Sequence, residues 1–465
     1  MKQLLPNPGN LFAAFLVLVC GHTALHAQSK PNVLIIVADD LGYNDLGFQG
    51  CKDIATPHLD KLAAQSVRCT SGYVSHPFCS PTRAGLLTGR YQQRFGHETN
   101  PEWLPESTRD GMPVSESTLG DALRKQGYKT GLVGKWHLGA HPQFHPLKRG
   151  FDECFTALGG GHQYFPAAHT KTEYRLPMDR SGVEEPQKAY LTDQFGDEAC
   201  AFAERHAGSP WFLYLAFNAP HTPLQAPPKA VAKLTHITDP RRRNYAAMIQ
   251  VMDANIGKLL AKLDATQQRT NTLVFFVSDN GGPLGEGKQK SFTDNTPLRG
   301  GKSDFYEGGS RVPFLVSWPA KLKPGQYDHP VSALDFYATA LAQTAAALPA
   351  DRQPDSVNLI PHLTGERTNA PHETLFWRGE GPGGNYAARQ GNWKLVRLGK
   401  QPAELYDLAS DIGETKNLAA EKPEVVTTLI AAIAAWEKGT VAPAFEPPRF
   451  QREKKAAEEK AKAAQ

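Results

Sequence analysis

The chain has 465 residues, which is enough for one large domain with an appendage or for two domains, and far more than a disulfide-stapled mini-protein needs. Lys and Arg number 51 and Asp and Glu 47, so the formal net charge is only +4. The basic residues are spread along the chain rather than gathered in one stripe, which argues against nucleic acid as a partner.

The first 27 residues have the layout of a secretory signal peptide. Lys2 precedes an apolar run over residues 11–19, and small and polar residues follow up to Ala27. The run is too short to span a membrane, so we expect a secreted or periplasmic protein with no integral membrane segment in the mature chain. A buried helix fits less well because Pro and Gly flank the run. A lipid anchor on Cys20 is also disfavoured, because Val19 is a poor match to the small residue that such processing prefers.

Loss of the signal peptide leaves an odd number of cysteines for an oxidising compartment. At least one thiol therefore has no disulfide partner and is available for chemistry. Spacing does not determine how the others pair, and they fit equally well as small buried side chains. The remaining cysteines are Cys51, Cys69, Cys79, Cys154 and Cys200.

From residue 31 onward, apolar runs alternate with amphipathic stretches. This pattern predicts an α/β fold with a large, mostly parallel sheet sandwiched by helices. A helix is predicted over 245–263, where apolar residues recur at helical spacing, and we interpret those residues as core packing. The apolar runs predict buried strands at 33–37, 130–133, 211–217 and 272–277.

The composition changes after residue 348, where Pro349 and Pro354 mark a linker. The elements beyond it predict a small C-terminal α+β subdomain with an antiparallel sheet. Its strands are expected at 374–377, 386–389, 393–398 and 404–408, and its helix at 423–436. The predicted division is a signal peptide at 1–27, a main domain at 28–350, the subdomain at 351–450, and a charged helical or disordered tail at 451–465.

Carboxylates directly follow two of the predicted strands. Asp39 and Asp40 follow the strand at 33–37, and Asp279 and Asn280 follow the strand at 272–277. Either pair alone is more simply a helix cap or a turn. Two such pairs at equivalent strand ends predict a shared site, because ligands gather at the carboxyl edge of a parallel sheet. Hard oxygen ligands of this kind suit Ca²⁺ or Mg²⁺ rather than zinc.

A third element, residues 76–90, reads HPFCSPTRAGLLTGR. Cys79 is followed by Pro81 and then by helix-compatible residues, which places the cysteine at a helix N-terminus. Free backbone N–H groups there favour an anion such as sulfate or phosphate.

The Cys-x-Pro-x-Arg core at 79–83, with Thr88 and Gly89, resembles the signature of the type I sulfatases of the alkaline phosphatase superfamily. The resemblance covers about residues 31–418 and implies an alkaline phosphatase-like fold. Thr82 stands where serine is commoner, and we expect no loss of cysteine conversion from it. Further blocks similar to the family's occur in the same order: GKWHLG at 134–139, NAPHTP at 218–223, SDNGG at 278–282, LRGGK at 298–302 and EGGSRVP at 307–313.

The resemblance implies that a maturation enzyme oxidises Cys79 to formylglycine (3-oxoalanine), and that Ca²⁺, rather than Mg²⁺, is the metal. A plain thiolate would form an adduct that water clears poorly, whereas a hydrated aldehyde has one hydroxyl to attack sulfur and another to expel sulfate. The implied metal ligands are Asp39, Asp40, Cys79, Asp279 and Asn280. Arg83 and Lys135 are implied to hold the nucleophile, Lys302 the sulfate, His137 to take a proton from the hydrate, and His221 to protonate the leaving oxygen.

Substrate residues are predicted from loop position. Aromatic and polar side chains at the rim suit a sulfated sugar. The run GGGHQY at 159–164 is similar to loops of bacterial carbohydrate sulfatases that recognise galactose-type sugars, which implies an exo-acting enzyme on sulfated galactose or N-acetylgalactosamine. A phosphodiesterase or phosphonate monoester hydrolase of the same superfamily and a non-catalytic carbohydrate-binding protein are the alternatives. The candidate rim residues are Trp103, His162, Gln163, Tyr164, Trp377 and Arg378.

Overall fold

A computed structural model describes residues 30–446, except 171, 286–289, 345, 347, 349–351 and 353. Within these residues the chain forms a ten-stranded mixed sheet. In sheet order its strands are β11 (Gly325–Tyr327), β2 (Val67–Cys69), β10 (Phe314–Ser317), β9 (Thr272–Ser278), β1 (Asn32–Ala38), β8 (Trp211–Ala216), β4 (Lys129–Lys135), β5 (Glu153–Ala157), β6 (Met178–Arg180) and β7 (Val183–Glu185). The five strands from β9 to β5 are parallel, and antiparallel pairings flank them.

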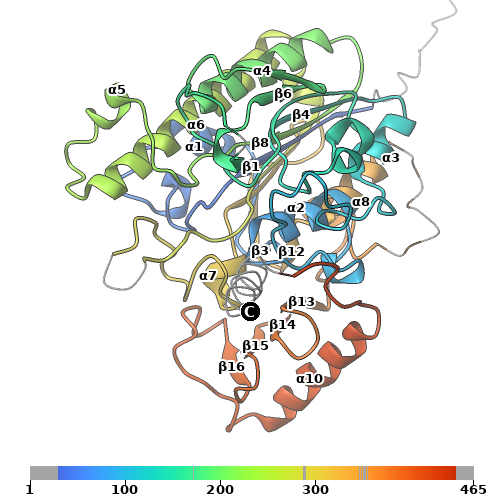
Figure 1. The fold of residues 1–465 in the computed structure, drawn as a ribbon. Coiled ribbons are helices and arrows are strands. Elements are labelled where there is room, and N and C mark those ends of the chain that lie inside the picture. Colours follow the sequence, from blue (N-terminus) through green and yellow to red (C-terminus); the bar gives the residue numbers. More distant parts are fainter. Residues whose placement is uncertain are drawn as a thin grey trace, which may run out of the picture.

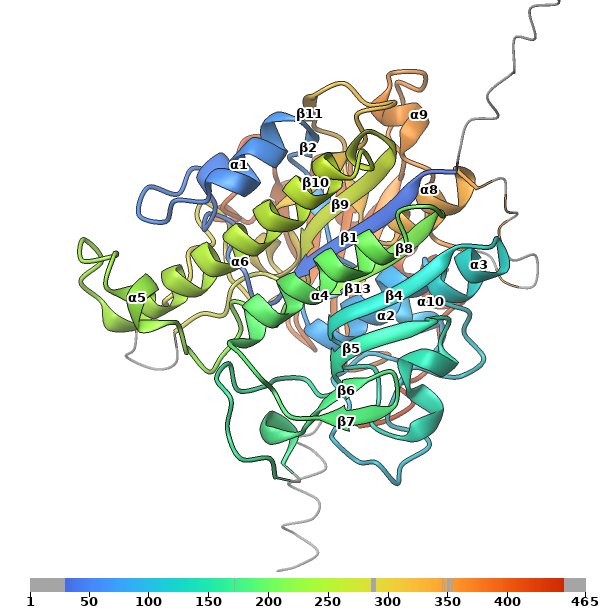
Figure 2. The same cartoon turned by 90° about the horizontal axis from the view of Figure 1, so that it is seen from above.

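Helices cover both faces of this sheet (Figure 2). One layer contains α1 (Pro57–Ala64), α4 (Leu191–Arg205) and α6 (Pro240–Ala265), and the other contains α2 (Cys79–Thr88), α3 (Leu119–Lys125) and α8 (Asp335–Ala342). Side chains of a strand point alternately to its two faces. Leu34 and Ile36 of β1 therefore pack in the first layer, and Val33, Ile35 and Val37 pack in the second. The predicted α/β sandwich is confirmed.

The predicted helix at 245–263 lies within α6 but begins later than the real one. Asp239 caps the helix by accepting hydrogen bonds from the backbone N–H groups of Arg241 and Arg242, and Pro240 occupies the first turn. Other short elements include β3 (Gly72–Tyr73), which pairs with β12 (Val331–Ser332), and three four-residue helices, α5 (Pro228–Val231), α7 (Glu307–Ser310) and α9 (Ile360–Leu363).

The C-terminal part forms a separate four-stranded antiparallel sheet, at the bottom of Figure 1. It consists of β13 (Thr374–Gly379), β14 (Asn385–Gln390), β15 (Trp393–Arg397) and β16 (Glu404–Asp407), and helix α10 (Pro423–Glu437) packs on it. The other face contacts the main domain, where the Lys394 ammonium lies 2.8 Å from the Glu307 carboxylate with both side chains fully buried. All four strands and the helix match the predicted elements.

Two predicted segments lie outside the described residues: the signal peptide at 1–27 and the tail at 451–465. Cys51, Cys69, Cys79, Cys154 and Cys200 all have free thiols. Four of these five are buried, as small apolar side chains are. In the part of the chain that the structure describes, no helix is both long and apolar enough to cross a membrane.

Candidate active site

The two acidic strand ends meet at the carboxyl edge of the sheet. Strands β1 and β9 are parallel neighbours with Ala38 opposite Ser278, so Asp39 and Asp279 lie side by side. The Asp40 N–H donates to Asp279 Oδ1 at 3.2 Å. Asp40 itself has a φ of 64°, a left-handed conformation that costs energy in a non-glycine residue and turns its side chain into the site.

Each of these carboxylates has a cationic partner from another element. Lys135 Nζ, at the end of β4, lies 2.6 Å from Asp39 Oδ2, and both side chains are fully buried. Arg83 Nη2, on α2, lies 2.7 Å from Asp279 Oδ2. Lys302 Nζ lies 2.8 Å from Asp40 Oδ1. Three carboxylates thus balance three cations, and a divalent cation bound here would give the site a net positive charge suited to an anionic ester.

These charges shift the pKa values of the acids in opposite directions. Burial alone raises the pKa of Asp39, but the charges of Lys135, His221 and Arg83 outweigh burial and hold it well below its usual range. The pKa of Asp40 is also lowered, because Lys302 and His221 outweigh its burial. For Asp279, burial and the charge of Asp39 outweigh Arg83 and raise the pKa to about 6.

Cys79 is the first residue of α2, as its sequence context predicted. Its Sγ lies 3.7 Å from Asp39 Oδ1, and burial raises the pKa of the thiol to about 12. Helix α2 is buried along its whole length. Its first turn is held in place because Ser80 Oγ donates to the carbonyl of His137 at 2.6 Å and the Ser80 N–H donates to Asn100 Oδ1 at 2.9 Å.

The donor set fits a divalent cation. Ligand atoms of Asp39, Asp40, Cys79 and His221 all lie within 4.8 Å of one another. Asn280 Nδ2 donates to Asp40 Oδ1 at 2.8 Å, whereas the buried Asn280 Oδ1 has no hydrogen-bond partner among the described residues. A buried amide oxygen without a donor is costly unless a cation satisfies it.

Two histidines face the same space. His137 has a φ of 58°, and burial, reinforced by Lys135 and Arg83, lowers its pKa well below the usual value, so the ring is neutral. His221 Nδ1 donates to the carbonyl of Thr222 at 2.6 Å, which leaves Nε2, 3.6 Å from Asp40 Oδ2, as the atom that gains or loses a proton. Burial lowers the pKa of His221 although Asp39 and Asp40 oppose it.

A pocket of about 300 Å³ opens over these groups. Of the predicted rim residues only Trp103 lines it. Of its lining residues outside the predicted set, Gly160 belongs to the glycine run at 159–161, and the others had no sequence pattern to mark them. The lining residues are Cys79, Asn100, Pro101, Glu102, Trp103, His137, Gly160, Glu173, Tyr174 and His221.

Arg378 was predicted at the rim, and this placement is wrong. Its side chain is fully buried and forms ion pairs with Glu98 and Glu437, and the neighbouring Trp377 donates its indole N–H to the carbonyl of Val74 at 2.8 Å. Both side chains join the C-terminal sheet to the main domain. A buried guanidinium needs these ion pairs, so the Arg378 side chain is not available to bind a sugar.

His162 and Gln163 do not line the pocket either. The two ring nitrogens of His162 lie 2.7 Å and 2.8 Å from the carbonyls of Gln163 and Leu176, and Gln163 Oε1 accepts a hydrogen bond from Gln225. The buried Tyr164 hydroxyl lies 2.8 Å from the carbonyl of His221 and supports that loop. These side chains support the loops around the pocket and do not line it.

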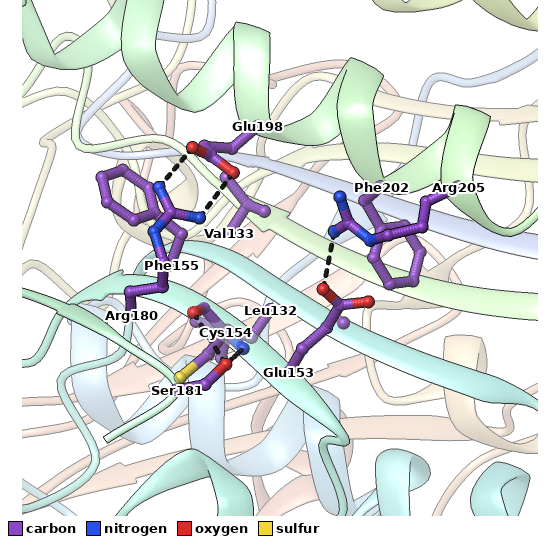
Figure 3. Close-up of a pocket in the computed structure, with 11 residues that line it drawn as sticks. Leu132, Val133, Glu153, Cys154, Phe155, Arg180, Ser181, Glu198, Phe202 and Arg205 are labelled. Atoms are coloured by element: carbon purple, nitrogen blue, oxygen red, sulfur yellow. Dashed lines mark hydrogen bonds and ion pairs between the residues drawn. The ribbon is translucent and has the colours of Figure 1, made fainter. Parts of the chain in front are cut away.

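A second pocket is lined by the middle of β4, the start of β5 and side chains of α4, and Figure 3 shows its lining residues. Its charged side chains satisfy one another. Arg180 pairs with Glu198, and Arg205 pairs with Glu153 at 2.6 Å. Among the described residues, the predicted catalytic groups Cys79, His137 and His221 line the first pocket and not this one.

The mixed sheet, the oxygen-rich strand ends and the helix N-terminus at Cys79 define a metal-dependent hydrolase of anionic esters. The family model "Sulfatase" matches residues 31–346, and the model "N-sulphoglucosamine sulphohydrolase, C-terminal" matches residues 301–437. The chain belongs to the sulfatase family and is a sulfuric ester hydrolase.

Named relatives cover most of the chain. N-acetylgalactosamine-6-sulfatase of Homo sapiens is 36% identical over 77% of this chain and 70% of its own length. Steryl-sulfatase of Mus musculus is 34% identical over 75% of this chain and 68% of its own length. The crystal structure of Ps i-CgsB in complex with k-i-k-neocarrahexaose superposes with a TM-score of 0.85 and 37% identity, covering 90% of this chain and 95% of that one.

Proposed function

We propose that this sulfatase removes a sulfate group from the end of a carbohydrate of galactose or N-acetylgalactosamine type. Two relatives support a saccharide substrate: one is named for N-acetylgalactosamine and the other was solved with a neocarrahexaose. Aromatic Trp103 and Tyr174 at the pocket add to this support, because aromatic faces stack on sugar rings. The enzyme acts outside the cytoplasm, secreted or periplasmic, after loss of residues 1–27.

The observation that carries the proposal is the position of Cys79 beside Asp39, with Arg83 and Lys135 close by. Residue 79, once a maturation enzyme has oxidised it to formylglycine, supplies a hydrated aldehyde as the nucleophile toward sulfur. Asp39, Asp40, residue 79, Asp279 and Asn280 would hold Ca²⁺, which would supply positive charge to neutralise the ester. Arg83 and Lys135 orient residue 79, and Lys302 contacts the sulfate.

The two histidines divide the proton transfers. His137 is neutral in its buried position and therefore takes the proton of the hydrate. His221 presents Nε2 to the pocket while its Nδ1–H remains on the carbonyl of Thr222, so a proton gained at Nε2 is passed to the departing sugar oxygen. Loss of either ring is expected to lower kcat far more than it changes KM.

Sulfate and phosphate esters of one aryl alcohol test the reaction type. We expect a higher kcat/KM on the sulfate, and a higher value on the phosphate would favour a phosphodiesterase or phosphonate monoester hydrolase instead. A panel of sulfated galactose, N-acetylgalactosamine and glucosamine then tests the sugar. Protein with intact formylglycine and metal that turns over none of them would favour a non-catalytic carbohydrate-binding role.

A further inference from the structure

The outer half of the pocket, lined by Glu102, Trp103, Glu173 and Tyr174, differs in composition from the floor, which is formed by Cys79 and the metal-binding carboxylates. Glu102 and Trp103 line it from one loop, and Glu173 and Tyr174 line it from another. None of the four belongs to the groups that hold the metal or the nucleophile. Tyr174 remains 36% exposed, and its ring centroid lies 6.5 Å from that of His221, so a partly exposed aromatic ring lies beside the reaction centre.

Three consecutive glycines, Gly159, Gly160 and Gly161, pack closely against side chains around the pocket. A Cβ on Gly159 would lie 2.5 Å from Glu173 Cγ, one on Gly160 would lie 2.5 Å from His137 Nε2, and one on Gly161 would lie 2.3 Å from Tyr174 Cζ. Each glycine thus makes room for a different side chain of the pocket. The Gly160 N–H also donates to Glu173 Oε1 at 2.5 Å, which fixes that carboxyl group.

The two residues after the glycines complete the support. His162 contacts the carbonyl of Leu176, and the Gln163 N–H donates to the carbonyl of Tyr174 at 3.0 Å. The segment that carries Glu173 and Tyr174 is therefore fastened on both sides to the glycine loop. Apart from Gly160, which lines the pocket, the block GGGHQY supports the side chains that face the pocket rather than lining it.

The outer half of the pocket is acidic, whereas the charged side chains of the floor balance one another. The described residues that line the pocket include Glu102 and Glu173 and no lysine or arginine, and Lys135, Arg83 and Lys302 each pair with a carboxylate of the floor. Glu102 and Glu173 line the same pocket; burial raises the pKa of Glu173, and the charge of Glu102 adds to that rise while the Gly160 N–H and Lys135 oppose it. Carboxylates accept hydrogen bonds from hydroxyl groups and repel a second anion.

We propose that Glu102 and Glu173 are specificity-determining residues that accept only a sugar with neutral hydroxyls around a single sulfate, and that they reject a second sulfate or a uronic carboxylate on that sugar. Trp103 and Tyr174 supply the apolar faces for the ring. This inference rests on the proposed carbohydrate substrate and narrows it from sulfated sugars in general to monosulfated ones.

The test compares 4-nitrophenyl galactosides that carry one sulfate, at position 3, 4 or 6, with the corresponding disulfated compounds. Sulfate release gives kcat/KM for each, and the readout is the ratio of monosulfated to disulfated values. We expect the wild type to prefer the monosulfated sugar by tenfold or more, and Glu102→Gln and Glu173→Gln each to reduce that ratio by about tenfold. Glutamine keeps the size of the side chain and an oxygen for the Gly160 N–H.

The matched control is Glu106→Gln, which removes an exposed carboxylate only four residues from Glu102 and outside the pocket. This control is expected to leave the ratio unchanged. A ratio near one in the wild type, or a ratio that neither pocket variant alters, overturns the inference while the proposed function stands. Absence of turnover on every galactoside, with an aryl sulfate still hydrolysed, overturns the proposed substrate class and this inference with it.

Discussion

Gly160→Ala should disable catalysis without unfolding the protein. The new Cβ would lie 2.5 Å from His137 Nε2, and because an ordinary contact begins at 3.4 Å, the ring must move by about 0.9 Å. The His137 backbone cannot follow easily, because its N–H donates to the carbonyl of Leu158 and its carbonyl accepts from Ser80 Oγ. Displacement of a catalytic group by about 1 Å can cost on the order of 100-fold in rate.

The assay is kcat on an aryl sulfate, divided by the fraction of protein that contains formylglycine. We expect a fall of about 100-fold in Gly160→Ala, with a melting temperature within a few degrees of the wild type. Gly208→Ala is the control, because that glycine is exposed and a Cβ there meets nothing within 4 Å. A Gly160→Ala enzyme with more than a third of the wild-type kcat would refute the view that His137 must occupy its present position.

Three further outcomes are expected. Lys394→Met should lower the free energy of unfolding by about 3–5 kcal/mol, because it removes the buried ammonium that lies 2.8 Å from the Glu307 carboxylate. A loss below about 1 kcal/mol in urea titrations would contradict this expectation. The charge of Asp335, 2.9 Å from His372, outweighs burial and raises the pKa of His372. The ion pair between them therefore stabilises the folded state fully below about pH 6.5, and this stabilisation is lost as the pH rises through the raised pKa. His372→Gln should therefore lower the free energy of unfolding more at pH 6 than at pH 8.5. Chelation should abolish turnover and lower the melting temperature, and Ca²⁺ should restore both at lower concentration than Mg²⁺, whereas full activity after exhaustive chelation would refute the metal site.

The sequence allowed the strands and the metal-binding edge to be predicted because the relevant signals are local. A continuous apolar run such as 33–37 predicts a buried strand, and Asp39 lies at the end of that strand because it follows directly in the sequence. Register then brings Asp279 beside it.

Apart from Trp103, the outer pocket could not be predicted, because its residues are placed by contacts between segments far apart in the sequence. Arg378 looked like a rim residue until its ion pair with Glu98, 280 positions away, placed it in the interior. Glu173 carries no motif, and its place at the pocket depends on its contacts with Gly159 and Gly160. The glycine run was the one available signal, and its meaning depended on which side chains lie against it.

Peptide mass spectrometry of the segment containing Cys79, on enzyme purified in its active form, tests the central claim most directly. The account predicts the mass of an aldehyde or its hydrate at residue 79, in a proportion that tracks kcat from one preparation to the next. A fully active preparation in which Cys79 is entirely unmodified thiol would contradict it.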